Sequence, residues 1–292
     1  MQRILGRTGV RVPAIAFGCG PVSGLLTGSD FALQLATVKR ALDTGIDWFD
    51  TAAGYGNGSS ETNLGRVLKE LGATARIATK VRIPEGGFDC IEACVRESVQ
   101  ASLARLGVDS VELLQLHNGI TGSRGDEPAS IAPADAIQVL TTFRKLQSDG
   151  LVRHIGLTGT GNPDALREVI RSGGFDTLQV PYNLLNPSAG GGAAPAGDTD
   201  YGNIIADCAE QSMGVFAIRV FAGGALLGQP PSAHTLKTPY FPLGLYERDC
   251  ERAKDVNASA AAAVRFVLDH PQIHAAIIGF GSPSHVDEIV PN

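Results

Sequence analysis

Short apolar runs rich in β-branched residues alternate along the chain with longer stretches whose apolar residues recur at helical spacing. The short runs predict strands at residues 14–17, 46–51, 76–81, 111–117, 154–158, 177–182, 215–220 and 275–279. The longer stretches predict helices at residues 31–43, 61–70, 90–106, 134–149, 163–171, 203–211 and 258–269. Gly45, Gly150 and Gly173 follow three of these helices, where a left-handed C-terminal cap is favoured.

This order of elements predicts an α/β protein whose residues 1–292 form one domain, a single (β/α)8 TIM barrel. The length would also allow two domains, but no change of composition marks a linker. Residues 186–200 and 229–244 lack apolar periodicity and are predicted to be long loops after the sixth and seventh strands. A flexible surface loop is the favoured interpretation of the first, and a lid over a site is the alternative.

Charge and composition exclude several classes of partner. The 24 basic and 30 acidic residues give a net charge of -6, so no broad basic surface is available for nucleic acid. No apolar run is long enough to span a membrane, and no signal-peptide pattern follows the first residues. We therefore expect a cytoplasmic protein whose partner is a small molecule, and the sequence does not indicate an oligomeric state.

The five cysteines give no pattern typical of a disulfide framework or a zinc site. They are odd in number and widely spaced, and they contain no CxxC pair. We expect reduced, mostly buried thiols and no bound metal. The cysteines are Cys19, Cys90, Cys94, Cys208 and Cys250.

Four chemically distinct side chains fall at or just after consecutive predicted strand ends. Asp50 ends the second strand, and Tyr55 follows five residues later. Lys80 lies near the end of the third strand and His117 ends the fourth. Each of these residue types alone is common in turns, on surfaces or in structural hydrogen bonds. Because barrel enzymes assemble their active sites at these strand ends, the set as a whole predicts one catalytic site.

Such a set suits hydride transfer between a carbinol carbon and a nicotinamide. Tyr55 would be the general acid or base, and Lys80 would lower the phenol's pKa from about 10 by favouring the phenolate. Asp50 would pair with Lys80 and keep a buried cation tolerable. His117 would hydrogen-bond the substrate oxygen and fix its orientation.

Several separated segments together resemble the aldo-keto reductase superfamily over most of the chain. They are DWFDTAAGYGNGSSETNLGRVLKE, IATKV, ELLQLHN, LGRTGVRVPAIAFGCG, VRHIGLTG, LQVPYNLLN and IIGFGSPSHVDEIV. The resemblance implies a catalytic Asp, Tyr, Lys and His tetrad, which Asp50, Tyr55, Lys80 and His117 match in order. It also implies a nicotinamide dinucleotide extended across the barrel mouth, with no metal and no Rossmann domain.

A Rossmann dinucleotide fingerprint is the competing interpretation of the glycines at 18–24, and it fails on context. The last glycine spacing is one residue too long, and Pro21 stands where the helix should begin. A backbone turn at the barrel mouth accounts better for this segment.

The resemblance also implies cofactor contacts. Thr158 and Gln179 match positions that hold the nicotinamide carboxamide, whereas Gly159 replaces an Asn of the family pattern and Ile218 replaces a stacking aromatic. Arg219 is unexpected; it would contact the dinucleotide diphosphate or an anionic substrate, or form a salt bridge at the rim. The candidate cofactor-binding residues are Gly20, Asp50, Thr158, Gln179, Arg219, Phe221, Gly223, Gly279, Gly281, Ser282, His285 and Glu288.

The last segment favours NAD over NADP as the cofactor. Residues 279–292 contain no Lys or Arg, and Gly281 stands where an Arg is frequent in the family. A 2'-phosphate would lack a partner there, and Asp287 or Glu288 would repel it or hydrogen-bond a free ribose hydroxyl.

Tyr55, His117 and Asn118 are the expected substrate contacts, and Arg124, Tyr240 and Phe241 are further candidates from the loops. The chain is only 6% aromatic, and this favours a sugar or a small polar carbonyl over a large flat substrate. The expected function is an NAD(P)-dependent oxidoreductase that interconverts an aldehyde, ketone or sugar hemiacetal with the corresponding alcohol or lactone. An epimerase or lyase that uses the nicotinamide transiently, and a non-enzymatic cofactor-sensing regulatory subunit, are the alternatives.

Overall fold

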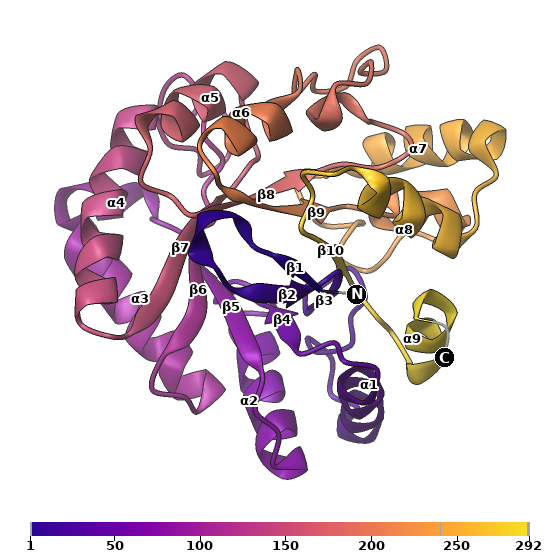
Figure 1. Cartoon of the computed structure of the whole chain (residues 1–292), viewed down its shortest axis with the longest axis horizontal. Helices are drawn as coiled ribbons and strands as arrows, with labels where there is room; N and C mark the ends of the chain where they lie inside the picture. Colours follow the sequence, from indigo (N-terminus) through magenta and orange to yellow (C-terminus); the bar gives the residue numbers. More distant parts are fainter. Residues whose placement is uncertain (1, 240, 291–292) are drawn as a thin grey trace.

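The computed structural model describes residues 2–239 and 241–290, and within them eight parallel strands close into a barrel. The order around the barrel is β10-β3-β4-β5-β6-β7-β8-β9, and helices surround it (Figure 1). The strands are β3 (Ile15–Gly18), β4 (Trp48–Asp50), β5 (Arg76–Val81), β6 (Val111–Leu116), β7 (Val152–Thr158), β8 (Thr177–Pro181), β9 (Gly214–Ile218) and β10 (Ala275–Ile278). Each overlaps a predicted strand, so the predicted (β/α)8 barrel is confirmed.

The seven predicted helices are all present, with ends shifted by a few residues. They are α1 (Phe31–Asp43), α2 (Ser59–Leu71), α3 (Ile91–Leu106), α4 (Pro133–Ser148), α5 (Pro163–Ser172), α6 (Ile204–Glu210) and α8 (Ala260–Asp269). Short polar side chains begin several of them: the Asp30 carboxylate accepts from the Leu33 N–H, and the Asn162 side chain caps α5 in the same way. The three predicted cap glycines all have positive φ.

Two helices, α7 (Leu243–Val256) and α9 (Pro283–Ile289), were not predicted. Along α7 the buried side chains are Tyr246, Asp249 and Ala253, which lie at helical spacing, but one of the three is charged and the apolar pattern is therefore interrupted. The predicted loop at 229–244 was therefore too long, because α7 begins at Leu243.

A small antiparallel hairpin closes the N-terminal end of the barrel. Strands β1 (Gln2–Ile4) and β2 (Arg11–Pro13) form it, and in Figure 1 it crosses the centre of the barrel. Leu5 and Val12 from this segment are fully buried against Trp48 and Phe216 inside the barrel. The barrel floor is therefore apolar and shut.

Side-chain alternation along the strands places polar groups directly above this floor. Residues two apart in a strand share a face, so Trp48, Ala78 and Leu113 in the apolar floor are followed by Asp50, Lys80 and Gln115 on the same inner face. All three polar residues are buried. The chemistry predicted at the strand ends is thus built on a packed support.

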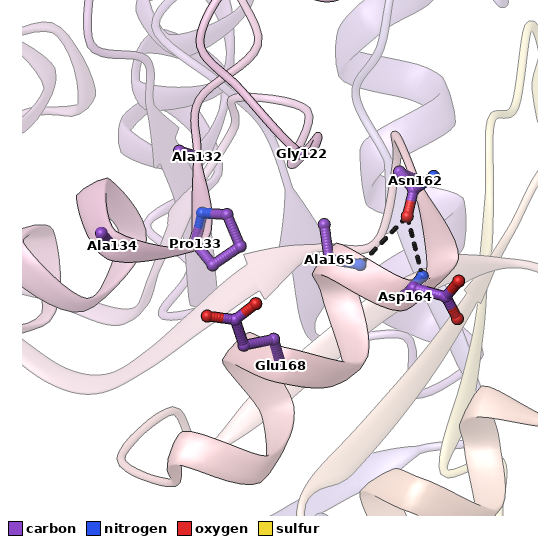
Figure 2. Close-up of a pocket in the computed structure, with 8 residues that line it drawn as sticks. All are labelled: Gly122, Ala132, Pro133, Ala134, Asn162, Asp164, Ala165 and Glu168. Atoms are coloured by element: carbon purple, nitrogen blue, oxygen red, sulfur yellow. Dashed lines mark hydrogen bonds between the residues drawn. The ribbon is translucent and has the colours of Figure 1, made fainter.

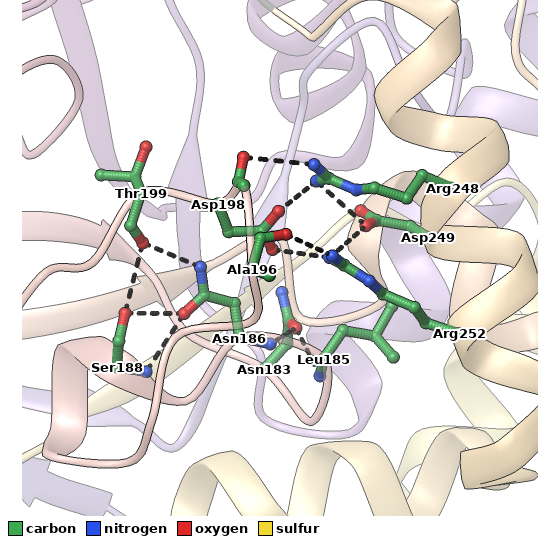
Figure 3. Close-up of polar contacts among 11 residues, drawn as sticks. Asn183, Leu185, Asn186, Ser188, Ala196, Asp198, Thr199, Arg248, Asp249 and Arg252 are labelled. Carbon is green, nitrogen blue, oxygen red and sulfur yellow. Dashed lines mark hydrogen bonds and ion pairs between the residues drawn. The ribbon is translucent and has the colours of Figure 1, made fainter.

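The predicted loop at 186–200 is tied to the rest of the protein by polar contacts (Figure 3). Asn186 donates from its amide to the Thr199 carbonyl, and Arg252 donates to the Ala196 carbonyl and to the Asp198 carboxylate. Arg248 of α7 also pairs with Asp198. This loop is therefore anchored to α7, in contrast to the free surface loop that its composition favoured.

No helix within residues 2–239 and 241–290 is long and apolar enough to cross a membrane.

Candidate active site

A cavity of about 1510 Å³ opens at the C-terminal ends of the barrel strands. It is lined by loops after β3, β4, β6, β9 and β10 as well as by residues of the strands themselves. The four predicted catalytic residues, Asp50, Tyr55, Lys80 and His117, all line it. The structure therefore brings together the four side chains that the strand-end pattern placed at one mouth.

Lys80 is the centre of the polar network. Its Nζ donates to Asp50 Oδ2 at 2.5 Å, to the Thr51 carbonyl at 2.8 Å and to Tyr55 Oη at 3.2 Å. The Lys80 and Asp50 side chains are only 1% and 4% exposed. A buried ammonium with three acceptors and a carboxylate partner is fully satisfied, which makes its burial tolerable.

The second oxygen of Asp50 is held by two glutamines. Gln115 Nε2 donates to Asp50 Oδ1 at 3.1 Å, and Gln179 Nε2 donates to the same oxygen. The amide nitrogen of Gln179 is thus engaged by Asp50, and the residue also lines the cavity. Both glutamines are buried, so Asp50 is fixed from three sides.

The candidate residues did not include Gln115. Its strand register pairs it with Lys80 across the β5–β6 ladder, and it lies two residues before His117 on the inner face of the barrel. Period-2 alternation back from His117 is the signal that could have found it. Its Oε1 has no hydrogen-bond partner among the described residues.

The pKa of Tyr55 is set by opposing effects of burial and of neighbouring charges. Burial raises the pKa of the phenol, Lys80 lowers it and Asp50 raises it, and the net direction is upward from the ordinary value. The lowering by Lys80 is as expected, but the effect of burial exceeds it. Tyr55 therefore carries its proton at neutral pH.

The pKa of Lys80 moves in the direction that keeps it charged. Burial lowers the pKa of the amine, but Asp50 and Tyr55 together outweigh that effect, and the net direction is upward. The ammonium therefore persists beside the Tyr55 hydroxyl.

His117 lies edge-on to the Tyr55 ring, with the ring centroids 5.6 Å apart. Burial, Lys80 and Arg82 all lower the pKa of its imidazole well below the ordinary value. The imidazole is therefore neutral at physiological pH, and it can hydrogen-bond a substrate oxygen without competing for the proton of Tyr55.

Most predicted cofactor residues share this cavity. Those of the predicted cofactor residues that line it are Gly20, Asp50, Thr158, Gln179, Arg219, Phe221, Gly223, Gly279, Gly281, His285 and Glu288. Ser282 is not among the lining residues, and its hydroxyl lies 2.8 Å from that of Ser284. The structure therefore gives no support to a cofactor contact by the Ser282 side chain.

Thr158 and Gly159 form the part of the wall that would face a carboxamide. Thr158 Oγ1 is buried and has no hydrogen-bond partner among the described residues, which suits a polar ligand group. A Cβ on Gly159 would lie 2.9 Å from the Gln179 carbonyl oxygen, so an Asn does not fit there. The glycine is thus what this close approach of the turn to β8 requires.

The far end of the cavity carries Gly281, His285 and Glu288. A Cβ on Gly281 would contact the His285 ring at 3.4 Å, and the Gly281 N–H donates to His285 Nδ1. Asp287 is turned away and pairs with Arg40 of α1. Glu288 lines the cavity and Asp287 does not.

Arg219 lines the cavity at the end of β9, and its guanidinium lies over the Phe241 ring at 4.7 Å. Its φ is +56°, a left-handed value that is unfavourable for a residue with a Cβ. The Arg219 carbonyl accepts from the Asn183 side chain at 2.9 Å, which holds this turn. Phe241 thus contacts the site through Arg219.

Asn118 is placed away from the cavity. Its amide donates to the Ile83 and Ala129 carbonyls and accepts from the Ile83 N–H, and the residue is buried. Both the nitrogen and the oxygen of its amide are used in hydrogen bonds to the loop backbone, which contradicts the expected substrate contact. Arg124 is engaged by Asp135 and also does not line the cavity, while Tyr240 lies outside the described residues.

A second, smaller hollow of about 450 Å³ lies between the N-terminal ends of α4 and α5 (Figure 2). Ala132, Pro133 and Ala134 face Glu168 across it, and the Asn162 cap forms one edge. It shares no residue with the catalytic cavity.

Replacing Gln115 by Met should test its role in holding Asp50. A hydrogen bond to a charged group contributes about 1.5–3 kcal/mol, so loss of this donor should lower kcat about tenfold or more. The KM for substrate should change little, because Gln115 does not line the cavity. Steady-state kinetics with a thermal unfolding control measures this, and a change confined to KM would contradict it.

The chain matches a known protein family over most of its length. The family model described as "Aldo/keto reductase family" matches residues 14–291. The chain is 27% identical to an L-galactose dehydrogenase of Arabidopsis thaliana over 291 residues, which cover 99% of this chain and 86% of the relative. It is 26% identical to a D-threo-aldose 1-dehydrogenase of a Pseudomonas species, with 96% and 89% covered.

Solved structures show the same architecture. The holo form of aldo-keto reductase AKR11C1 from Bacillus halodurans superposes with a TM-score of 0.73 at 23% identity, over 99% of this chain and 89% of that one. The glycerol dehydrogenase AKR11B4 of Gluconobacter oxydans gives a TM-score of 0.71 at 25% identity, over 99% and 88%. Together with the buried tetrad at the barrel mouth, the matched family model shows that this chain is an oxidoreductase of the aldo/keto reductase family.

Proposed function

We propose that this protein is an NAD-dependent sugar dehydrogenase, which oxidises the anomeric hydroxyl of an aldose to a lactone. The observation that carries the proposal is the buried contact of Lys80 with Asp50 and Tyr55, set beside His117 in a large cavity. The names of two relatives, one an L-galactose and one a D-threo-aldose dehydrogenase, support the substrate class.

The wall of the cavity suits a polyhydroxylated substrate. The lining includes Thr27, Arg82, Glu127, Thr160 and Thr199, which supply hydroxyl, guanidinium and carboxylate groups for hydrogen bonds. Trp48 is fully buried in the barrel floor, so it offers no aromatic face to a ligand.

Each residue of the tetrad has its own role in the proposed reaction. The Tyr55 oxygen takes the proton of the substrate hydroxyl during oxidation and returns it during reduction. Lys80 stabilises the phenolate, and Asp50 holds Lys80 in place. Neutral His117 hydrogen-bonds the same substrate oxygen. A bound nicotinamide supplies the hydride acceptor.

Several residues that line the cavity are suited to bind a nicotinamide dinucleotide. The unpartnered hydroxyl of Thr158 would bond the carboxamide, with Gln179 beside it. Gly223 and Gly279 would allow the backbone to approach the diphosphate closely, and Glu288 would accept from a ribose hydroxyl.

NADH should bind at least ten times more tightly than NADPH. Among the described lining residues the lysines and arginines are Lys80, Arg82 and Arg219, and none belongs to the segment from Gly279 onward. A 2'-phosphate near Glu288 would meet a like charge, which costs several kcal/mol. Fluorescence titration with both cofactors measures the two dissociation constants.

Two substitutions test which residues set the cofactor preference. Gly281→Arg combined with Glu288→Gln should move the preference toward NADPH, and Glu288→Gln alone is the matched control. Tighter binding of NADPH than of NADH by the unmodified protein would contradict the assignment.

The substrate class is tested by incubating the enzyme with a panel of aldoses, polyols and small aldehydes in the presence of NAD or NADP. Formation of reduced nicotinamide should be fastest with aldoses and NAD, and the product should be a lactone. Turnover of aldehydes or polyols with none of the aldoses would overturn the sugar assignment while leaving the oxidoreductase assignment in place.

A further inference from the structure

Two cysteines outside the catalytic cavity lie in contact at the start of α3. Cys90 ends the 3-10 turn η2 (Glu85–Cys90), and Cys94 lies one turn into α3. Their Sγ atoms are 3.2 Å apart. Cys90 is exposed and Cys94 is partly exposed, whereas Cys19 and Cys208 are buried. The expectation of mostly buried thiols does not hold for this pair.

The backbone at Cys90 is what makes this pair unusual. Within a regular helix, residues four apart have Cβ atoms about 5–6 Å apart, which exceeds the roughly 3.5–4.5 Å that a disulfide requires. Cys90 is the N-cap residue, with φ −140° and ψ 40°, so helical geometry does not fix its Cβ. A small rotation at Cys90 can therefore bring the sulfurs to bonding distance without unwinding α3.

We propose that Cys90 and Cys94 form a reversible intramolecular disulfide when the protein meets a hydroperoxide. This goes beyond the proposed dehydrogenase function, because neither cysteine lines the catalytic cavity.

The reaction is balanced with hydrogen peroxide as the oxidant. The Cys90 sulfur, as thiolate, attacks one peroxide oxygen; the O–O bond breaks, a sulfenic acid forms and the other oxygen leaves as water after protonation. The Cys94 sulfur then attacks the Cys90 sulfur, and the S–S bond forms as the sulfenic oxygen leaves as a second water. Two thiols lose two electrons and two hydrogens, and one peroxide becomes two waters.

The order of attack follows from exposure and from the contact between the sulfurs. Cys90 is the more accessible of the two, so peroxide reaches it first. The hydrogen bond between the two sulfurs is the largest cause of a raised pKa at Cys94, so Cys94 is the less ready of the two to attack peroxide. Cys90 is therefore the attacking sulfur and Cys94 the resolving one.

Peptide mapping tests the proposal directly, because trypsin releases both cysteines in one peptide, residues 83–96. The folded protein is treated with a small excess of hydrogen peroxide, free thiols are alkylated under denaturing conditions, and the digest is analysed by mass spectrometry. We expect this peptide to lose two hydrogens and carry no alkyl group, and to regain two alkylation sites after dithiothreitol. The peptide of partly exposed Cys250 should remain alkylated as an internal control.

The single variants separate the roles of the two sulfurs. In Cys94→Ser, the sulfenic acid at Cys90 has no resolving thiol and should be trapped by dimedone; in Cys90→Ser, Cys94 should stay alkylatable. Both variants should keep the activity of the parent, which shows that they fold. Two alkyl groups on the 83–96 peptide after peroxide, or sulfinic acid at Cys90 in the unmodified protein with Cys94 still alkylated, would overturn the proposal.

Discussion

Replacing Tyr55 by Phe should lower kcat by about 10² to 10⁴-fold while leaving the affinity for the nicotinamide cofactor nearly unchanged. The substitution removes only the hydroxyl that Lys80 Nζ contacts at 3.2 Å, and the ring should keep its edge-on contact with His117. Proton transfer to or from the substrate oxygen then has no side-chain partner. Steady-state kinetics and a cofactor titration on the same preparation check this.

A control for Tyr55→Phe is available in the same chain. Tyr182→Phe removes the hydroxyl of another buried tyrosine, whose ring stacks on Phe266 at 5.2 Å and lies outside the catalytic cavity. This variant should keep the kcat of the parent. Turnover by Tyr55→Phe at the rate of Tyr182→Phe would remove Tyr55 from the reaction.

Replacing Lys80 by Met should have the largest effect on stability and should abolish most turnover. It leaves the Asp50 carboxylate, 4% exposed, without its cation. Breaking a buried ion pair in this way costs about 3–5 kcal/mol. Thermal or urea unfolding measures the loss, and the double variant Lys80→Met with Asp50→Asn should recover much of the stability without recovering activity.

The pH dependence of any residual oxidation by Lys80→Met gives a second readout. Lys80 lowers the pKa of Tyr55, although burial keeps the net pKa above the ordinary value. Removing the ammonium therefore raises that pKa further, and oxidation, which needs the phenolate, should require a higher pH than in the parent. A profile identical to that of the parent would contradict the role assigned to Lys80.

The barrel and the tetrad could be predicted because both depend on local periodicity. The alternation of short β-branched runs with helical stretches sets the eight strands, and Asp50, Lys80 and His117 then fall at strand ends whatever the exact packing. Tyr55 followed from its position in the loop after β4. None of these inferences required knowledge of long-range contacts.

Features that depend on packing could not be predicted in the same way. The pKa of Tyr55 depends on how deeply the phenol is buried, and the engagement of Gln179 by Asp50 depends on a contact across the barrel. Asn118 has the residue type of a substrate contact, but its amide is used by the backbone of Ile83 and Ala129. Helix α7 was not predicted because Asp249 lies within its buried stripe, and a charged residue there interrupts the apolar pattern.

Gly159 shows how packing explains a departure from the family pattern. The sequence indicates only that an Asn is missing, whereas the structure shows that a Cβ would lie 2.9 Å from the Gln179 carbonyl oxygen. The polar contact at this wall is therefore left to the unpartnered hydroxyl of Thr158.

The most direct test of the proposed dehydrogenase activity is a deuterium-transfer measurement with a C1-deuterated aldose and NAD. If Tyr55 takes the hydroxyl proton while the C1 hydride leaves, mass spectrometry should find the deuterium in the reduced nicotinamide, in a one-to-one ratio with lactone formed. Deuterium that stays in a sugar product or exchanges with water, without net reduction of NAD, would contradict the dehydrogenase assignment and favour a transient use of the cofactor, as in an epimerase or a lyase.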